Sequence, residues 1–261
     1  MLKKFVLITR GRTGSTAVLD ELGKSSPLCT TQELFLYQQF TVTGWNEHYR
    51  LLPPFDVWRQ QDGWWKRWFR YHGSDQRQAH DYLVHAEVLA QRKGVKGFGW
   101  KVLSHQLEER PFLSELLKRH GYCAIYLRRN IVGQVLSGMV ANQRGIYNSL
   151  EKVVDERRYH IDIGQFQWLV RWERECVKND CVRLATEGFD YIEVSYEDFC
   201  GDRQAFYKNI FNFLNLPLEV PPPSDFVKVI DDPKSVIENF DEVFDAALAL
   251  GEALEVEVRW A

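Results

Sequence analysis

The first residues of the chain place a glycine-containing turn directly between a predicted strand and a predicted helix. Lys3 to Thr9 is a short apolar run with β-branched side chains, which predicts a buried β-strand. The turn reads RGRTGST (residues 10–16), and beyond it Val18, Leu19 and Leu22 recur at helical spacing. Such a turn directs successive backbone N–H groups and a helix N-terminus at one point. The pattern therefore predicts an anion site within an α/β fold.

Strands and helices continue to alternate along the rest of the chain. Further buried strands are predicted at residues 97–103, 122–127 and 191–194. Helices are predicted at residues 131–141, where Asn130 is the expected N-cap, and at 165–182 and 206–214. This alternation predicts a parallel sheet covered on both faces. The expected fold class is α/β, with a P-loop-like parallel sheet flanked by helices.

A stretch at about residues 41–96 interrupts the alternation. We expect it to form a mainly helical insertion over the sheet, within a single domain that spans residues 1–261. The segment GWWKRWFRYHG (residues 63–73) mixes indoles with cations, which suits sugar rings or lipid headgroups. The helical spacing of its tryptophans equally fits anchoring of the insertion to the sheet. The tryptophans of the insertion are Trp45, Trp58, Trp64, Trp65 and Trp68.

Composition excludes several classes of protein. The net charge of −3 argues against a nucleic-acid partner, because a general polyanion binder carries a large basic excess. The five cysteines lack CxxC spacing and, like the rest of the sequence, offer no zinc motif. Reduced thiols of this kind are typical of a cytoplasmic protein. The sequence has no stretch of 18 apolar residues, so it predicts no membrane-spanning helix.

The first candidate site is the turn itself. Two arginines and three hydroxyl side chains add charge and donors to its backbone N–H groups. A nucleoside triphosphatase loop would read GxxxxGK[ST], and the missing lysine argues against a metal-dependent phosphoryl transferase. An ordinary strand-to-helix turn with solvated arginines is the alternative. The predicted anion-binding residues are Arg10, Gly11, Arg12, Thr13, Gly14, Ser15 and Thr16.

A second candidate site follows the strand at residues 122–127. Arg128 and Arg129 lie where this strand ends, and Ser137 comes about two turns into the next helix. Ligands of open parallel sheets bind beyond the carboxyl ends of strands, so Arg129 and Ser137 can converge on one phosphate. The alternative is a pair of surface arginines and a serine bonded to its own backbone. Two cationic strand ends in one sheet suit a ligand with a phosphate at each end.

These two segments resemble the cofactor motifs of sulfotransferases that use 3′-phosphoadenosine 5′-phosphosulfate (PAPS). The resemblance implies that residues 10–16 hold the 5′-phosphosulfate and that Arg129 and Ser137 hold the 3′-phosphate. The segment VSYEDF (residues 194–199) is similar to the family's Tyr-Glu-Asp segment, which implies that Tyr196 contacts the adenine. RTGST with a downstream QELF is most similar to bacterial carbohydrate and glycolipid sulfotransferases.

The resemblance also has departures. The cytosolic phenol and steroid enzymes carry Lys at the position of Arg12 and an aromatic residue where this chain has Ala17. Their C-terminal Arg-Lys-Gly segment has no visible counterpart here.

The implied reaction is in-line transfer of a sulfuryl group from PAPS, without a metal, to a hydroxyl or amine of a small-molecule, carbohydrate or lipid acceptor. The co-product is adenosine 3′,5′-bisphosphate. Such a transfer needs positioning and electrostatic stabilisation, and Arg12 is expected to stabilise the leaving phosphate. Two alternatives are a P-loop-like small-molecule kinase and a non-catalytic nucleotide-binding protein.

Two residues are candidates for the base that takes the acceptor's proton. Glu33 lies in TTQELFLY, a context similar to that of a catalytic glutamate in the bacterial enzymes. His105 follows a strand that contains Lys101, as the catalytic histidine of the cytosolic enzymes does, and a histidine has the more suitable intrinsic pKa. The family's histidine comes two residues after its lysine, however, whereas His105 comes four after Lys101. We therefore favour Glu33.

Overall fold

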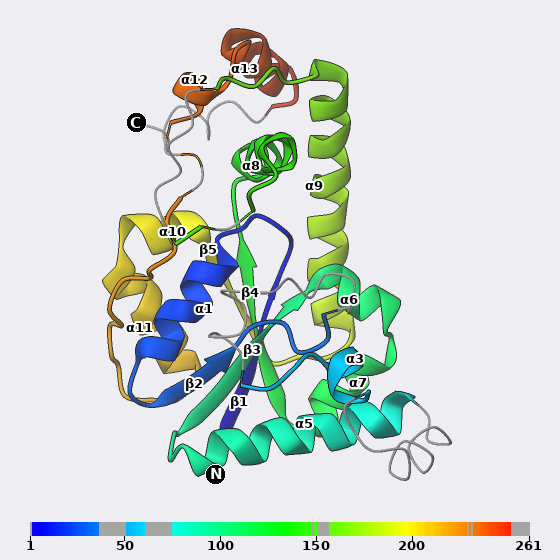
Figure 1. The fold of residues 1–261 in the computed structure, drawn as a ribbon, viewed down its shortest axis with the longest axis vertical. Coiled ribbons are helices and arrows are strands. Elements are labelled where there is room, and N and C mark those ends of the chain that lie inside the picture. Colours follow the sequence, from blue (N-terminus) through cyan, green and yellow to red (C-terminus); the bar gives the residue numbers. More distant parts are fainter. Residues whose placement is uncertain are drawn as a thin grey trace.

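The computed structural model describes residues 2–36, 51–60, 75–147, 149–150, 157–228, 230 and 232–251. Within them, five strands form one sheet in the order β2-β3-β1-β4-β5, with every neighbouring pair parallel (Figure 1). The predicted α/β class is confirmed. The strands are β1 (Lys3–Thr9), β2 (Leu28–Thr31), β3 (Gly97–Leu103), β4 (Tyr122–Arg128) and β5 (Tyr191–Ser195).

The central strand β1 is apolar along its length because both of its faces are covered. Its side chains alternate, so Phe5 and Leu7 join one core while Val6 and Ile8 join the other. Thr9 pairs in register with Leu103 of β3 and with Leu127 of β4. The carboxyl ends of three adjacent strands therefore meet at one edge, where open parallel sheets bind their ligands.

Helices cover both faces of this sheet. On one face lie α1 (Ser15–Lys24), α10 (Tyr196–Gly201) and α11 (Arg203–Phe213), whose apolar side chains pack on Phe5 and Leu7. The other face is packed against α5 (Asp75–Arg92), α6 (Ser104–Glu109) and α7 (Phe112–Arg119).

A third group of helices lies beyond the carboxyl edge of the sheet, at the top of Figure 1. It contains α8 (Ile131–Arg144), α9 (Ile163–Thr186), α12 (Pro233–Val236) and α13 (Phe240–Ala249) and has a core of its own. The predicted cap of α8 is present, since Oδ1 of Asn130 accepts a hydrogen bond of 2.8 Å from the N–H of Gly133. This group covers the edge where the strands end, and the C-terminal part of α9 runs down beside the sheet (Figure 1).

The predicted insertion is described in part. It contains α3 (Phe55–Trp58) and α5, and β2 precedes it in the chain. Tyr82 of α5 is fully buried, and its hydroxyl donates to the carbonyls of Leu34 at 3.2 Å and Pro53 at 2.6 Å. Trp58 packs on Tyr82 with 5.1 Å between ring centroids. The tryptophans at 45, 64, 65 and 68 lie outside the described residues, and the single-domain organisation stays a prediction.

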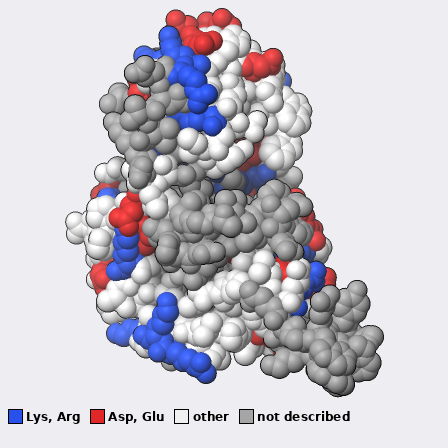
Figure 2. Space-filling model, viewed as in Figure 1, with Lys and Arg blue, Asp and Glu red and all other residues white. Residues whose placement is uncertain are grey.

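The described surface mixes charges of both signs. Lys and Arg side chains on the face shown in Figure 2 form small groups between acidic and uncharged surface. Among the described helices, none combines the length and the apolar character needed to cross a membrane.

Candidate active site

The loop between β1 and α1 is shaped by two residues with left-handed backbone. Gly14 caps α1 with φ 78°, and Arg12 has φ 66°, which is rare for a residue with a side chain. The ring of Tyr196 lies directly on the loop, so a Cβ atom added at Gly14 would sit 2.2 Å from Cε2 of this ring. Glycine is therefore required at position 14 on both counts. The strain at Arg12 is typical of a functional loop.

A cavity of about 560 Å³ lies beside this loop, a size within the usual range for small-molecule sites. Its walls come from the start of α1, the ends of β3 and β4, and from α8, α10 and residues 223–224, 226–228 and 230. It brings together most of the residues that the sequence nominated. Those lining it are Gly11, Arg12, Gly14, Ser15, Thr16, Glu33, Arg129, Ser137 and Tyr196.

Two arginines lie side by side in the wall of the cavity. Arg12 donates to the hydroxyl of Ser137 from Nε at 3.4 Å and from Nη2 at 3.2 Å, and its Nη1 donates to the carbonyl of Tyr147. Arg129 donates from Nη1 to the carbonyl of Arg12 at 2.9 Å. Burial and then the charge of Arg129 lower the pKa of Arg12 to about 10. Neither arginine has an ion pair with a carboxylate of the described residues.

An aromatic wall adjoins these arginines. The guanidinium of Arg129 lies 4.7 Å from the ring centroid of Tyr196, a cation–π distance. Burial raises the pKa of Tyr196, so its hydroxyl is neutral. Glu21 of α1 holds the neighbouring wall in place: it accepts from Arg203 at 2.7 Å and from the N–H of Ser224 at 2.8 Å.

A lysine–glutamate pair also lines the cavity. Nζ of Lys101, a buried residue of β3, lies 3.0 Å from Oε1 of Glu33 and 3.3 Å from the hydroxyl of Thr16. Gln106 donates to the second oxygen of Glu33 at 3.0 Å. Glu33 follows β2, the neighbour of β3, so strand pairing brings the two charges together. A fixed carboxylate beside a cation and a phosphate-type loop can accept a proton from a bound hydroxyl.

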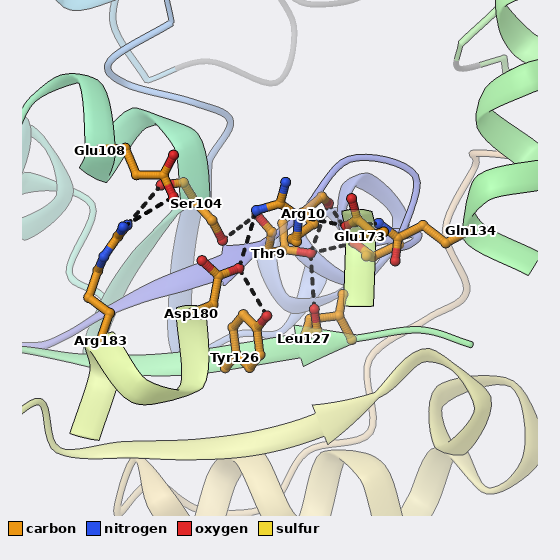
Figure 3. A network of polar contacts seen from close by, with 11 residues as sticks. Thr9, Arg10, Ser104, Glu108, Tyr126, Leu127, Gln134, Glu173, Asp180 and Arg183 are labelled. Atoms are coloured by element: carbon orange, nitrogen blue, oxygen red, sulfur yellow. Dashed lines mark hydrogen bonds and ion pairs between the residues drawn. The ribbon is translucent and has the colours of Figure 1, made fainter. Parts of the chain in front are cut away.

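Arg10 points away from this cavity, although it belongs to the same loop. Its Nε lies 2.6 Å from Oε1 of Glu173, and its Nη1 lies 3.5 Å from Oδ2 of Asp180 (Figure 3). Burial opposes the charge of Arg10, but these two carboxylates of α9 raise its pKa. Thr13 is also turned inward, with its hydroxyl bonded to Thr9 and, at 3.2 Å, to the carbonyl of Arg10.

The two candidate bases lie in different cavities. Glu33 lines the cavity of about 560 Å³, whereas His105 is an exposed residue of α6 that lines a second cavity of about 410 Å³. The second cavity lies between α8 and α9 and shares Gly11, Arg12 and Leu103 with the first. The fold thus separates the two candidates on either side of the loop.

A model of the sulfotransferase family matches residues 5–220 of the chain. The chain belongs to the sulfotransferase family. No curated protein sequence matches this sulfotransferase.

Among solved structures, it is similar to the sulfotransferase domain of the olefin synthase from Synechococcus PCC 7002. The TM-score is 0.53 at 14% identity, over 96% of this chain and 95% of that one. A sulfotransferase from Alicyclobacillus acidocaldarius gives a TM-score of 0.47 at 12% identity, over 99% and 96% of the two chains. The first likeness shows that the folds agree.

Several residues that line the cavity of about 560 Å³ in this sulfotransferase were not predicted from the sequence. Lys101 is the clearest, because a lone charge inside the apolar strand GFGWKVL is a signal that could have nominated it. Tyr147, Arg203 and Lys228 also line the cavity, and no local pattern marks them. Among the described residues, no three His, Cys, Asp or Glu side chains are arranged to hold a metal ion.

Proposed function

We propose that this sulfotransferase transfers a sulfuryl group from PAPS to a hydroxyl or amine of a small-molecule, carbohydrate or lipid acceptor. One observation carries the proposal: a single cavity brings together two different charge arrangements. Arg12 and Arg129 are half-buried side by side, while Lys101 and Glu33 form an ion pair. Burying like charges together is costly, and a bound anion removes that cost.

The donor matches these groups from end to end. Arg129 and Ser137 suit the 3′-phosphate, and the ring of Tyr196 offers a surface for the adenine. Backbone N–H groups of the loop and the N-terminus of α1 suit the 5′-phosphosulfate. Arg12 belongs to the loop but reaches Ser137, so it lies where the two anionic groups of PAPS would be closest together.

The proposed reaction assigns a task to Glu33, Lys101 and Arg12. Glu33 takes the proton of the acceptor's hydroxyl or amine as a new bond forms from that oxygen or nitrogen to sulfur. The bond between sulfur and the bridging phosphate oxygen breaks, and its electron pair leaves with adenosine 3′,5′-bisphosphate. Lys101 and Arg12 stabilise the charge that develops on the sulfuryl and leaving phosphate oxygens.

Two other functions are less well supported. A P-loop kinase would use a lysine on the outer phosphates, and the loop RGRTGST has none. A non-catalytic nucleotide-binding protein would have no use for the pair of Lys101 and Glu33 in the same cavity. A cytoplasmic location is part of the proposal, supported by the free thiols of all five cysteines.

The donor is tested by thermal unfolding in the absence of magnesium. Adenosine 3′,5′-bisphosphate should raise Tm far more than AMP, which lacks the 3′-phosphate; at 100 times its Kd a ligand adds about 2.7 kcal/mol to the free energy of unfolding. Arg129→Ala should abolish the difference between the two nucleotides. The adjacent Arg128→Ala is the matched control, because Arg128 is half-exposed, pairs with Glu193 at 2.9 Å and does not line the cavity.

Equal stabilisation of the unmodified protein by AMP and the bisphosphate would refute the 3′-phosphate site. Transfer itself is tested with PAPS labelled in its sulfur and an extract of the source cells. Label should appear in an acceptor with the unmodified protein and be strongly reduced with Glu33→Gln. Tight binding of the bisphosphate without any transfer would favour the non-catalytic alternative.

A further inference from the structure

The segment that carries Glu33 follows β2 without regular secondary structure, so other elements must orient its carboxylate. Two side chains of the described residues contact it, one on each oxygen. Nζ of Lys101 lies 3.0 Å from Oε1, and Nε2 of Gln106 donates to Oε2 at 3.0 Å. Because each oxygen of an ionised carboxylate accepts about two hydrogen bonds, both contacts leave room for the hydrogen of an acceptor.

The carboxamide of Gln106 can take only one of its two orientations. Its Oε1 accepts the backbone N–H of Leu103 at 3.1 Å, and a backbone N–H can only donate. The amide oxygen is therefore fixed on the side of Leu103, and the NH2 group faces Glu33. A donor at this point stabilises the ionised form of a carboxyl group, because a protonated oxygen would itself need an acceptor.

Gln106 belongs to a firmly held part of the molecule. It is 1% exposed, and α6 begins directly after β3. At the first residue of α6, the hydroxyl of Ser104 donates to the carbonyl of Thr9 at 3.3 Å (Figure 3). The carbonyl of Ser104 accepts from Nη1 of Arg183 on α9 at 3.4 Å. The end of β1 and α9 therefore both hold the helix that carries the amide.

Lys101, the other partner of Glu33, serves more than one group. Its Nζ also lies 3.3 Å from the hydroxyl of Thr16 at the start of α1, and Lys101 lines the cavity, whereas Gln106 does not. The proposed function gives Lys101 a task at the sulfuryl oxygens, and its long, flexible side chain can exchange Glu33 for them when the donor binds. Gln106 has no second task and keeps its contact with Glu33.

We propose that Gln106 is a positioning residue, which holds Glu33 ionised and oriented while Lys101 contacts the sulfuryl group. Gln106 acts through Glu33 and touches neither substrate. The inference rests on the proposed function for the task of Glu33, whereas the effect of Gln106 on Glu33 can be measured in the protein without donor or acceptor.

The first measurement is a pH titration of the Glu33 carboxyl signal by ¹³C NMR, in the full chain with labelled glutamate. The signal is assigned by its absence from Glu33→Gln. Gln106→Met keeps the length of the side chain but removes the amide. The pH at which the signal is half-shifted should rise by about one pH unit, because the ionised carboxylate loses a hydrogen bond.

A second variant keeps the helix cap intact. Gln106→Glu retains an oxygen for the N–H of Leu103 but places a second carboxylate beside Glu33. It should therefore also raise the pH of the half-shift. The charged groups around Glu33 are unchanged in both variants: Lys101 is in contact with it, and the others that line the cavity are Arg12, Glu21, Arg129, Arg203 and Lys228.

The second measurement is the release of labelled sulfate from PAPS labelled in its sulfur, with water as the acceptor. At a pH where Glu33 is ionised in every variant, Gln106→Met should release sulfate about 10-fold more slowly, because the carboxylate is no longer held in one orientation. The affinity for adenosine 3′,5′-bisphosphate should be unchanged, since Gln106 does not line the cavity. A general loss of structure would lower both.

Gln134→Met is the matched control. Gln134 is also buried, and its Nε2 donates to a carboxylate, Oε1 of Glu173, at 2.7 Å. This variant loses the same kind of hydrogen bond, so its Tm should fall as that of Gln106→Met does. The titration of the Glu33 signal should nevertheless stay where it is in the unmodified protein.

The inference is overturned if the Glu33 signal titrates at the same pH in the unmodified protein and in both Gln106 variants. It is also overturned if Gln134→Met moves the signal as far, or if Gln106→Met releases sulfate at the unmodified rate. Failure to bind the bisphosphate, or a release of sulfate that Glu33→Gln does not change, counts against the proposed function. An unmoved Glu33 signal counts against Gln106 alone.

Discussion

Arg10 and Arg12 are two residues apart in one loop, yet they enter regions with opposite charge balance. Arg10 enters the network under α9, where Glu173 and Asp180 neutralise it and Gln134 adds a further hydrogen bond (Figure 3). Arg12 enters the cavity, where its nearest charged neighbour is a second arginine, Arg129. The first region is complete within the protein, while the second has an excess of positive charge that suits a ligand.

This difference separates two kinds of charged residue within one motif. A buried cation with matched carboxylates holds α9 against the loop, so its loss should lower stability. A buried cation beside a like charge contributes little to stability, so its loss should lower ligand binding. The comparison therefore predicts that substitution of Arg10 lowers the free energy of unfolding, whereas substitution of Arg12 lowers the affinity for the ligand.

The largest expected effect is on stability at Arg10. Arg10→Met leaves Glu173 and Asp180 buried without their cation, which should cost about 3–5 kcal/mol in the free energy of unfolding. Arg12→Met should cost about 1 kcal/mol or less, because relief of the repulsion from Arg129 offsets the lost bonds to Ser137. Urea unfolding of both variants without ligand measures the two values. Equal losses would show that the two arginines do not differ in this way.

The next effect is on catalysis and compares the two sides of the loop. Glu33→Gln keeps the shape of the side chain but removes the base, so kcat should fall by about 10²-fold or more. The affinity for adenosine 3′,5′-bisphosphate should be nearly unchanged. His105→Ala, in the other cavity, should retain most of kcat. Normal turnover by Glu33→Gln together with an inactive His105→Ala would transfer the role of base to His105.

The smallest effect concerns Gly14 of the loop. Gly14→Ala introduces a Cβ at 2.2 Å from the ring of Tyr196 and a side chain at φ 78°, a strain of about 1–3 kcal/mol. Tyr196 must move, so affinity for the bisphosphate should fall by about 10-fold, the equivalent of 1.4 kcal/mol. Gly201→Ala is the control, since its Cβ would also meet nothing within 4 Å and Gly201 does not line the cavity. Calorimetric titration of both variants measures the difference, and equal affinities would contradict the position of Tyr196.

Local patterns predicted the sheet well because buried strands are apolar on both faces. The predicted bounds of β1 and β3 agree with the structure, and Asn130 caps α8 as expected. Bounds that depend on tertiary packing were less accurate. Helix α9, predicted at residues 165–182, extends beyond them at both ends, to Ile163 and Thr186.

By itself, the sequence determined the strand, turn and helix of the loop and the placement of Arg129 and Ser137 at one edge of the sheet. Both follow from local geometry, since parallel strands share their carboxyl edge and a helix keeps its register. Only the tertiary structure decided that Arg10 leaves the cavity and that Lys101 meets Glu33. These contacts depend on strand order and on where α9 packs, because a charged side chain is buried where distant residues provide its counter-charge.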